Sequence, residues 1–318
     1  MPSVVIISPY YNRATVVDRT VLGIINQTYS DYKAYFIDDG SKDDTFLELN
    51  KYSSEKILAI KQKNIGFTNT LIATIEKTDS EYIAIQGSGD CSFPNRLAHQ
   101  VQYLNDNPDV VMVGCHRVTV FESTGEELAV RPTVESDVRK QLFYCNPFTQ
   151  GEVLIRRSAY VKCGGYRSFF TYRQDLDLWL RISDYGRLAI IPEILYRNYK
   201  LRKSVSGDVR QLFAAMACRD FAVYCARERL AGCPDPLDQK GPVAALMRPR
   251  SKTLAFDLSH AAGRQALNGN RQEAEFLLAA AFNERPILLA WLMRLMVWLP
   301  GLKHLRKLIN GGLFDCRL

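Results

Sequence analysis

Short apolar runs alternate with helical patterns along the first 110 residues. Between the runs, apolar residues recur at helical spacing, as Val17, Val21 and Ile24 do. This alternation predicts an α/β fold with a mainly parallel sheet and helices on both faces. The runs predicted as strands are Val4–Ser8, Ala34–Ile37, Ile57–Ile60, Tyr82–Ile85 and Val110–Val113.

Polar residues and a proline mark the expected starts of these helices. Thr15 followed by Asp18 resembles a capping box, with aspartate in place of the usual glutamate. Ser41 and Asp44 are predicted to cap the second helix, and Pro94 suits the first helical position of a later one.

The pattern changes after Gly114, where strands predominate for a time. Turn residues 123–125 separate two apolar runs and predict a hairpin. The elements expected in this part are strands Val118–Phe121, Glu127–Val130, Val153–Ile155 and Leu188–Ile191, and a helix around Asp177–Ser183.

No strand pattern follows Asp208, so we predict an α/β domain over residues 1–207 and a helical region over 208–318. Gln211–Leu230 is predicted to be a helix, and Gly232–Arg250, with four prolines, a linker or irregular loop. Gly263–Pro286 resembles a single tetratricopeptide-like helix pair.

The segment Ile287–Leu299 is strongly apolar, contains Trp291 and Trp298, and is too short to span a bilayer. Basic residues follow it up to Lys307, which is the layout of an interfacial helix. A core helix with a solvated basic tail is the alternative. The sequence therefore leaves contact of Ile287–Lys307 with a membrane surface open.

Composition is that of an ordinary globular protein, with 47% hydrophobic and 24% charged residues among 318. The net charge of +7 suits nucleotide diphosphates or anionic lipids, and we expect no nucleic-acid partner. None of the eight cysteines forms a C-x-x-C pair, which disfavours zinc and redox-dithiol sites. The N-terminus has no signal-peptide pattern, so a cytoplasmic location is expected, peripheral on the inner face of the membrane if the C-terminal region binds lipid.

Three polar segments follow predicted strands: Ser8–Asn12, Asp38–Ser41 and Gln86–Asp90. Ligands of open α/β sheets bind at such carboxyl ends. The adjacent carboxylates Asp38 and Asp39 repel each other and are better explained by a ligand with hydroxyl and ring N–H groups than by packing. Neither G-x-G-x-x-G after the first strand nor a P-loop motif occurs, which disfavours dinucleotide dehydrogenases and P-loop NTPases.

A set of short motifs in this order resembles the inverting family 2 glycosyltransferases, which have the GT-A fold. The resemblance covers about Ser3 to Ser206. Each motif is weak alone, whereas the ordered set is specific. The matching segments are Ser8–Asn12, Gln27–Tyr29, Asp38–Asp43, Asn64–Gly66, Pro94–Leu97, Gly164–Arg167 and Asp175–Leu180.

The resemblance implies roles for individual residues. Asp175 matches the family's catalytic base, although Gln174 stands where the family has glutamate. Asp177 is the fallback base, and Trp179 is either core or a wall of the acceptor site. Asn146 is expected to touch the acceptor or to shape its loop. The nucleotide-binding residues implied are Pro9, Tyr11, Asn12, Asp38, Asp39, Ser41, Asn64 and Gly66, with Asp39 accepting from the base.

One departure concerns the family's D-x-D motif, whose carboxylates hold Mg²⁺ or Mn²⁺ against the donor diphosphate. Both ligand positions are glycine here, Gly87 and Gly89, and only Asp90 remains. One carboxylate with substrate phosphates can hold Mg²⁺, so metal bound through Asp90 stays open. The alternative is that basic side chains of Arg202 and its neighbours replace some or all of the metal's role. The donor diphosphate and sugar contacts expected are Gly87, Ser88, Asp90, Arg202 and Lys203.

The resemblance implies an inverting transferase that moves a sugar from a nucleotide-sugar, a UDP-sugar by family, to a glycan or lipid-linked acceptor in cell-surface polysaccharide synthesis. A sugar-nucleotide-binding or scaffold protein with a degenerate D-x-D motif and little activity is the alternative. Asp175 separates the two, because only an enzyme needs it. The helical region would supply membrane contact, acceptor binding or homo-oligomerisation.

Overall fold

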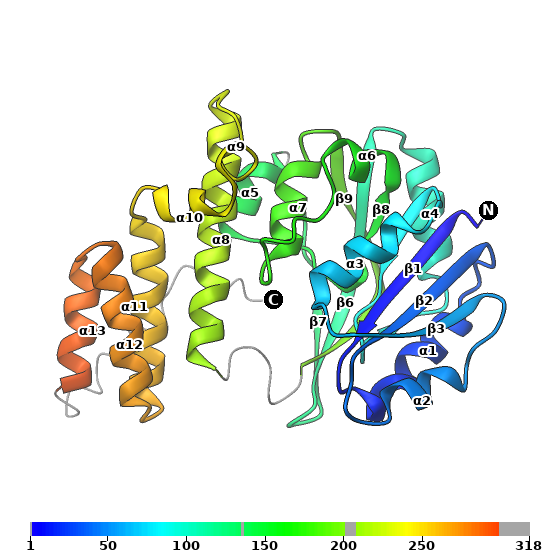
Figure 1. The fold of residues 1–318 in the computed structure, drawn as a ribbon, viewed down its shortest axis with the longest axis horizontal. Helices are drawn as coiled ribbons and strands as arrows, with labels where there is room; N and C mark the ends of the chain where they lie inside the picture. The colour runs from blue at the N-terminus through cyan, green and yellow to red at the C-terminus, as the bar shows by residue number, and fades with distance from the viewer. Residues whose placement is uncertain (1, 135–136, 201–207, 299–318) are drawn as a thin grey trace. The chain divides into compact units, whose positions relative to one another are not determined.

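A computed structural model of the chain describes residues 2–134, 137–200 and 208–298. Arg202 and Lys203, and the basic residues up to Lys307, lie outside the described residues. The chain divides into two compact units, one before and one after the segment 201–207 (Figure 1). Each unit is described by itself.

The first unit is built on one mixed sheet in the order β3-β2-β1-β4-β8-β6-β9-β5, with β7 paired to β6. The predicted strands are all present, and 110–113 and 118–121 belong to a single long strand, β6. The strands are β1 (Val4–Tyr10), β2 (Tyr32–Asp39), β3 (Ile57–Gln62), β4 (Tyr82–Ile85), β5 (Cys91–Ser92), β6 (Val110–Phe121), β7 (Glu126–Val130), β8 (Leu154–Arg156) and β9 (Arg187–Lys200).

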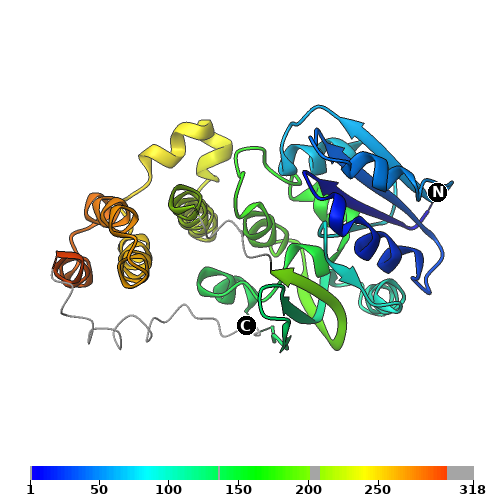
Figure 2. The ribbon, with the colours of Figure 1, turned by 90° about the horizontal axis from the view of Figure 1, so that it is seen from below.

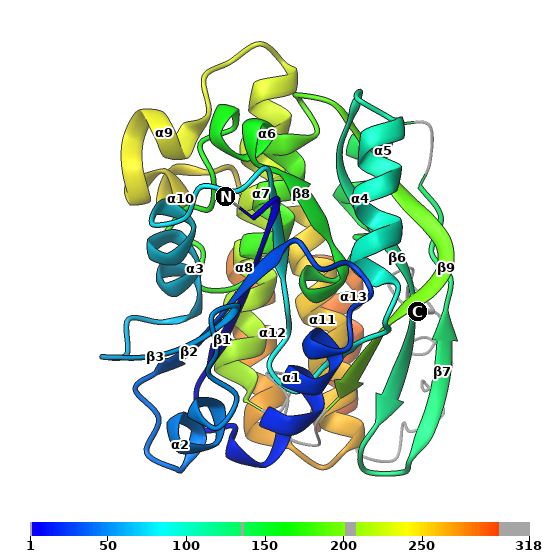
Figure 3. The ribbon, with the colours of Figure 1, turned by 90° about the vertical axis from the view of Figure 1, so that its right-hand side faces the viewer.

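Helices connect these strands and cover both faces of the sheet (Figure 3), as the alternating pattern predicts. The predicted capping box at Thr15 is wrong: a short 3₁₀ turn precedes α1, and the N-cap of α1 is Val16 without a side-chain bond. The helices are η1 (Ala14–Val16), α1 (Val17–Ile25), α2 (Thr45–Asn50), α3 (Phe67–Glu76), α4 (Arg96–Asp106), α5 (Val138–Tyr144), η2 (Gln150–Glu152), α6 (Arg157–Lys162) and α7 (Gln174–Ile182).

Parallel pairing brings the carboxyl ends of β3, β2, β1 and β4 to one edge. In the register, Tyr10 lies beside Asp38, and Asp39 lies beside Gln62. β4 pairs with β1 up to Ile85, so the loop that follows β4 emerges at the same edge. This edge is where ligands of open α/β sheets bind.

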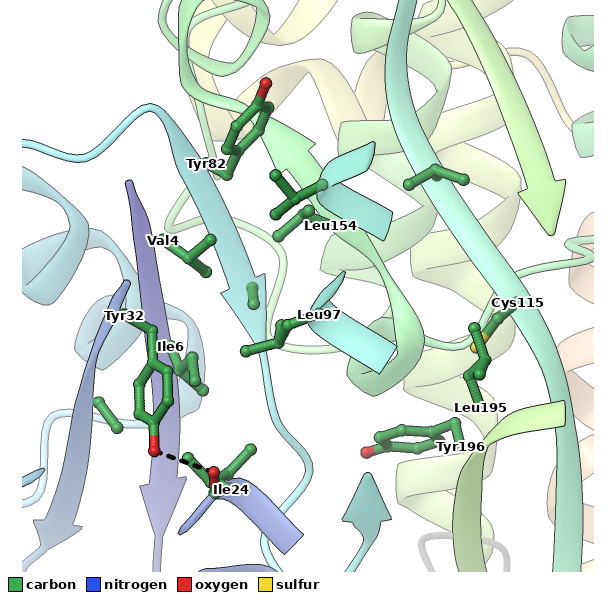
Figure 4. Packing of buried hydrophobic residues seen from close by; sticks show 14 of the residues in the cluster. Val4, Ile6, Ile24, Tyr32, Tyr82, Leu97, Cys115, Leu154, Leu195 and Tyr196 are labelled. Carbon is green, nitrogen blue, oxygen red and sulfur yellow. Dashed lines mark hydrogen bonds between the residues drawn. The ribbon is translucent and has the colours of Figure 1, made fainter. Parts of the chain in front are cut away.

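A continuous core fixes the strands that carry this edge. Val4 and Ile6 of β1 pack with Ile24 of α1 and Leu97 of α4 on one face of the sheet (Figure 4). Tyr32 of β2 donates from its hydroxyl to the Ile24 carbonyl at 3.0 Å, which ties α1 to the sheet. Burial of such apolar surface is the main favourable term in folding.

The second unit is entirely helical in its described residues. The segment 232–250, predicted as a linker or irregular loop, contains three short helical turns, which corrects that prediction. No described helix is long and apolar enough to cross a bilayer. The elements are α8 (Val209–Leu230), α9 (Pro236–Lys240), η4 (Gly241–Val243), α10 (Ala244–Met247), α11 (Lys252–Leu267), α12 (Arg271–Glu284) and α13 (Leu288–Trp298).

Three of these helices form the core of the second unit. Leu258 of α11, Leu277 of α12 and Met293 of α13 belong to one buried apolar cluster. Viewed along their axes, α11, α12 and α13 lie side by side (Figure 2). The helix pair predicted for residues 263–286 begins too late, because α11 starts at Lys252 and only its last turn lies in that range; α12 fills the rest, and α13 adds a third helix.

A buried ion pair crosses the first unit next to the strand-end loops. Arg117 of β6 donates from Nη1 to Glu152 Oε2 at 3.0 Å, and both side chains are almost fully buried. Glu152 also accepts from the Thr149 backbone N–H at 3.2 Å and from the Thr149 hydroxyl at 2.9 Å. The pair therefore anchors the turn 149–152 on the sheet.

Replacing Glu152 by glutamine should leave the Arg117 guanidinium buried without a counter-charge. Loss of one member of a buried pair typically costs about 3–5 kcal/mol of unfolding free energy. Urea unfolding followed by circular dichroism measures this loss. Asp109→Asn, which breaks the exposed pair with Arg187, is the matched control and should leave the midpoint unchanged. Equal midpoints for the two variants would contradict the anchoring role.

Candidate active site

The β2 carboxylates shape the edge rather than standing free in it. Asp39 Oδ1 accepts from Gln62 Nε2 at 2.8 Å and from the Ile65 backbone N–H at 2.9 Å, and Oδ2 accepts from the Gly66 N–H at 2.9 Å. Gly66 has a φ of 85°, a conformation that favours glycine. Asp39 therefore holds the turn 62–66 against β2, and Oδ2 keeps one acceptor position for a ligand.

The loops after β1 and β2 are locked to each other. The Asn12 backbone N–H donates to the Ser41 hydroxyl at 2.9 Å, and Asn12 Oδ1 accepts from the Lys42 N–H at 2.8 Å. Asp38 Oδ1 accepts from the Ser41 N–H at 2.9 Å. Asp38 Oδ2 is buried and has no hydrogen-bond partner among the described residues. An orphaned carboxylate oxygen at a strand end suits a ligand hydroxyl.

The other predicted nucleotide-binding residues differ in how exposed their side chains are. The Tyr11 side chain is 47% exposed, so its ring can stack against a planar base. Asn64 is exposed on the neighbouring turn. Pro9 is buried within β1, as Asp38 and Asp39 are within β2, and its place in the pocket wall stays a prediction.

The loop after β4 is folded around a part-buried carboxylate. Asp90 Oδ1 accepts from the Tyr199 N–H at 2.9 Å, and Oδ2 accepts from the Tyr196 hydroxyl at 2.8 Å. The same hydroxyl accepts from the Gly87 N–H at 3.1 Å. A Cβ on Gly87 would lie 2.3 Å from Asp90 Oδ2, so this arrangement requires glycine. Gly89 has a φ of 102°, which also favours glycine.

These residues do not fit a divalent cation. Asp90 is the one carboxylate of this loop, since positions 87 and 89 are glycines, and burial raises the pKa of its carboxyl. The described residues contain no cluster of three acidic, histidine or cysteine side chains that could hold a metal. Mg²⁺ and Mn²⁺ prefer several oxygen ligands. The expectation that Asp90 holds Mg²⁺ or Mn²⁺ is therefore not supported by the geometry.

A second carboxylate, which is part-buried, lies in the first turn of helix α7. Asp175 Oδ2 accepts from Asn146 Nδ2 at 3.2 Å, and Asn146 Oδ1 in turn accepts from the Phe148 N–H at 3.1 Å. Burial raises the pKa of Asp175, while the charge of Arg173 and the bond from Asn146 act in the opposite direction. A carboxylate with a raised pKa and few partners suits a general base.

Asp177 and Trp179 belong to the interior of the domain. Asp177 is buried and paired with Arg167 and Arg181, the latter at 2.7 Å. Trp179 is fully buried and meets Phe148 edge-on, with ring centroids 6.5 Å apart. Both oxygens of Asp177 are taken by arginines, and the Trp179 ring packs against Phe148 in the core, so neither side chain is offered to an acceptor. This corrects the expected acceptor contacts of both residues and removes Asp177 as the fallback base.

Hydrogen bonds connect the Asp175 region to the strand-end loops. Thr68, two residues after Gly66, donates from its hydroxyl to the Phe170 carbonyl at 2.9 Å, and Phe170 precedes α7. Gln174 donates to Gln150 Oε1 at 2.9 Å. A Cβ on the next residue, Gly151, would lie 2.1 Å from the Tyr196 hydroxyl. The strand-end loops and the Asp175 region are therefore held by contacts within the same domain.

Sequence patterns do not reveal three residues that contribute to this region: Gln62, Arg19 and Tyr196. Tyr196 lies in the later half of β9, beyond the predicted strand, and meets Gly87 across 109 residues. From the sequence, Arg19 is expected on the exposed face of an amphipathic helix. Only the pairing of distant segments shows that these side chains meet the strand-end loops.

A groove elsewhere in the same unit shares no residue with this site. Its volume is about 380 Å³, and its lining includes Tyr103, His116, Pro132 and Leu188. None of the predicted site residues contributes to it.

Comparisons with known proteins agree with the fold and the motifs. The chain is 31% identical over 238 residues to the putative glycosyltransferase EpsE of Bacillus subtilis (strain 168), covering 72% of this chain and 83% of EpsE. It is 29% identical over 227 residues to the O-antigen biosynthesis glycosyltransferase WbnJ of Escherichia coli, covering 67% and 84% of the two chains.

Among solved structures, residues 1–349 of S. aureus TarS in complex with UDP-GlcNAc superpose with a TM-score of 0.55, covering 88% of each chain at 10% identity. At that identity the likeness shows the fold alone, which is the GT-A fold. The family model for glycosyl transferase family 2 matches residues 5–176, more than half of the chain. The chain belongs to glycosyl transferase family 2.

Proposed function

We propose that this glycosyltransferase moves a sugar from a UDP-sugar to a hydroxyl of a glycan or lipid-linked acceptor, with inversion, in cell-surface polysaccharide assembly. The observation that carries the proposal is the part-buried Asp175 carboxylate, which is held by Asn146 and follows a segment bonded to the strand-end loops. WbnJ, an O-antigen biosynthesis enzyme, supports the acceptor class, and the UDP-GlcNAc complex of TarS supports the donor class.

In this proposal Asp175 acts on the acceptor. Its carboxylate takes the proton of the acceptor hydroxyl while that oxygen forms a bond to the anomeric carbon. The bond from that carbon to the diphosphate breaks on the opposite face, and its electron pair leaves with UDP. Attack opposite the leaving group inverts the anomeric configuration.

Nucleotide contacts are proposed at the edge formed by β1, β2 and β4. The exposed Tyr11 ring would stack on the base, and Asp39 Oδ2 would accept from the base. Asp38 Oδ2, which has no partner among the described residues, would accept from a ribose hydroxyl. Ser88, part-buried in the loop after β4, would lie near the donor sugar.

Replacing Asp175 by asparagine keeps the shape of the side chain and removes the base. Loss of a general base typically lowers kcat by about 10²–10⁴-fold. We expect this loss in the hydrolysis of UDP-sugars without acceptor, while the Kd for UDP stays within about two-fold because the nucleotide loops are unchanged. Asp184→Asn, in the turn after α7, is the matched control.

Hydrolysis of UDP-sugars by Asp175→Asn at the rate of the unmodified chain would contradict the assignment of the base. Tight UDP binding without any sugar transfer or hydrolysis by the unmodified chain would favour the binding-protein alternative instead.

The Asn146 side chain should set the pH profile. Asp175 works only when ionised, so kcat/KM falls as the pH drops through its pKa. Asn146 donates to the ionised form and lowers that pKa, so Asn146→Ala should raise it and move the acidic limb to higher pH. Rate–pH profiles test this shift. Asn105→Ala, which removes a bond to Tyr82, should leave the profile in place, and an unmoved limb in Asn146→Ala would exclude the interaction.

A stripe on α13 supports the proposed contact with a membrane surface. Leu288, Trp291, Leu295 and Trp298 recur at helical spacing, and each is between 50% and 76% exposed. The guanidinium of Arg294 lies 5.8 Å from the centroid of the Trp291 ring. Apolar and aromatic residues beside basic ones are typical of helices that lie in the bilayer interface.

The double variant Trp291→Ala, Trp298→Ala should weaken binding to vesicles rich in phosphatidylglycerol by about ten-fold or more, since each ring buries a large apolar surface. Vesicle co-sedimentation measures the change. Leu246→Ala, on a residue that is 87% exposed outside the stripe, is the control. Unchanged sedimentation would exclude the contact. Light scattering of the same variants tests the other expectation, a homo-oligomer that buries this stripe.

A further inference from the structure

A positive side chain stands beside the glycine loop after β4. Arg19, in the first turn of α1, is placed so that its Nη2 atom would lie 3.3 Å from a Cβ built on Gly89. Its guanidinium lies 3.4 Å from the centroid of the Tyr199 ring. The same group bonds Glu122 Oε1 from Nη2 at 3.0 Å. Two neighbours therefore hold the guanidinium in one orientation at this loop.

The backbone around Arg19 is tied to the same loop. The next residue, Thr20, accepts from the Gly89 N–H at 2.8 Å through its hydroxyl. The Arg19 side chain is 26% exposed, so it reaches the surface of the site. Its Nε atom is buried and donates to no group among the described residues. Arg19 thus combines a fixed position with partial exposure, and its guanidinium carries more N–H donors than the bond to Glu122 uses.

A metal site needs several acidic ligands, whereas the loop after β4 has one carboxylate and a guanidinium beside it. A D-x-D motif would place two carboxylates at positions 87 and 89, and both positions here are glycines with structural reasons to be glycine. The remaining carboxylate, Asp90, is already bonded to Tyr196 and Tyr199. A guanidinium faces the loop instead of a cluster of acidic ligands.

We infer that Arg19 binds the donor diphosphate in place of a divalent cation. The inference rests on the proposed function, because it requires a nucleotide diphosphate at the strand-end loops. A guanidinium can donate two parallel hydrogen bonds to phosphate oxygens. Tyr199 keeps the guanidinium plane in position. The guanidinium binds the diphosphate and Glu122 together, and Glu122 is 30% exposed.

The role of Arg19 in the reaction is electrostatic. As the bond from the anomeric carbon to the diphosphate oxygen breaks, the electron pair stays on that oxygen and its negative charge grows. The fixed positive charge of Arg19 stabilises this charge, and Arg19 neither gains nor loses a proton. A fixed charge placed next to a charge that develops in the transition state is often the largest single contribution to catalysis.

The first test is the binding of UDP and of uridine to the full chain by isothermal titration calorimetry. The titrations are run in excess EDTA and again with Mn²⁺. We expect UDP to bind in EDTA with an affinity within about two-fold of that with Mn²⁺, because the diphosphate is held by a side chain. Uridine, which lacks phosphates, should bind more weakly and equally in both buffers.

Variants then separate the charge from the shape of Arg19. Arg19→Leu should weaken UDP binding by about ten-fold or more, the usual scale for loss of a charge-assisted bond, and leave uridine binding within about two-fold. Arg19→Lys keeps the charge without the fork and should give an intermediate affinity. Arg187→Leu, which removes an exposed arginine paired with Asp109, is the matched control and should bind UDP normally.

Several results would overturn the inference. These are UDP binding that requires Mn²⁺, unchanged UDP affinity in Arg19→Leu, or an equal loss of UDP and uridine in that variant. Melting temperatures show whether Arg19→Leu folds. If it does not fold, UDP binding is measured on Arg19→Lys and Arg19→Gln instead. Equal UDP affinity of these two variants and the unmodified chain would overturn the inference. Failure of every nucleotide to bind in both buffers would overturn the proposed function as well, whereas Mn²⁺-dependent binding would overturn only the role of Arg19.

Discussion

The Tyr196 hydroxyl is the contact on which this edge of the sheet depends. It donates to Asp90, accepts from the Gly87 N–H and fills the space where Gly151 has no side chain. One strand, β9, thereby sets the loop after β4 and the turn 149–152 together. Because the same hydroxyl also binds Oδ2 of Asp90, the contact that shapes the site also fixes the one carboxylate of this loop.

The two halves of the site are stabilised in different ways. Parallel strands present the loops of the nucleotide half, and Asp39 closes one of these loops by accepting three hydrogen bonds. The Asp175 half depends on buried charges: Arg117 with Glu152 beneath the turn 149–152, and Asp177 with Arg181 within α7. Buried pairs are costly to break, so this half is expected to be rigid. Rigid positioning of a base against an acceptor is a large part of catalysis.

The sequence predicts the fold well because strand and helix periodicity are local properties. The strands of the first 110 residues all lie where their apolar runs predict, and the family motifs lead to Asp175. The fates of individual side chains depend on non-local packing and are predicted less well. Asp177 looks like a site residue but meets Arg167 and Arg181 in the interior, whereas Arg19 looks like a surface residue but meets Gly89. Neither outcome is visible before the helices are placed on the sheet.

The central claim is that a nucleotide diphosphate binds where β1, β2 and β4 end, next to Arg19 and in the same site as Asp175. A crystal structure of the full chain grown with UDP in the presence of EDTA tests this most directly. The account predicts the uracil against Tyr11 and Asp39, with the diphosphate oxygens within hydrogen-bond distance of the Arg19 guanidinium. UDP bound instead in the groove lined by His116 and Pro132, or a diphosphate turned away from Arg19, would contradict it.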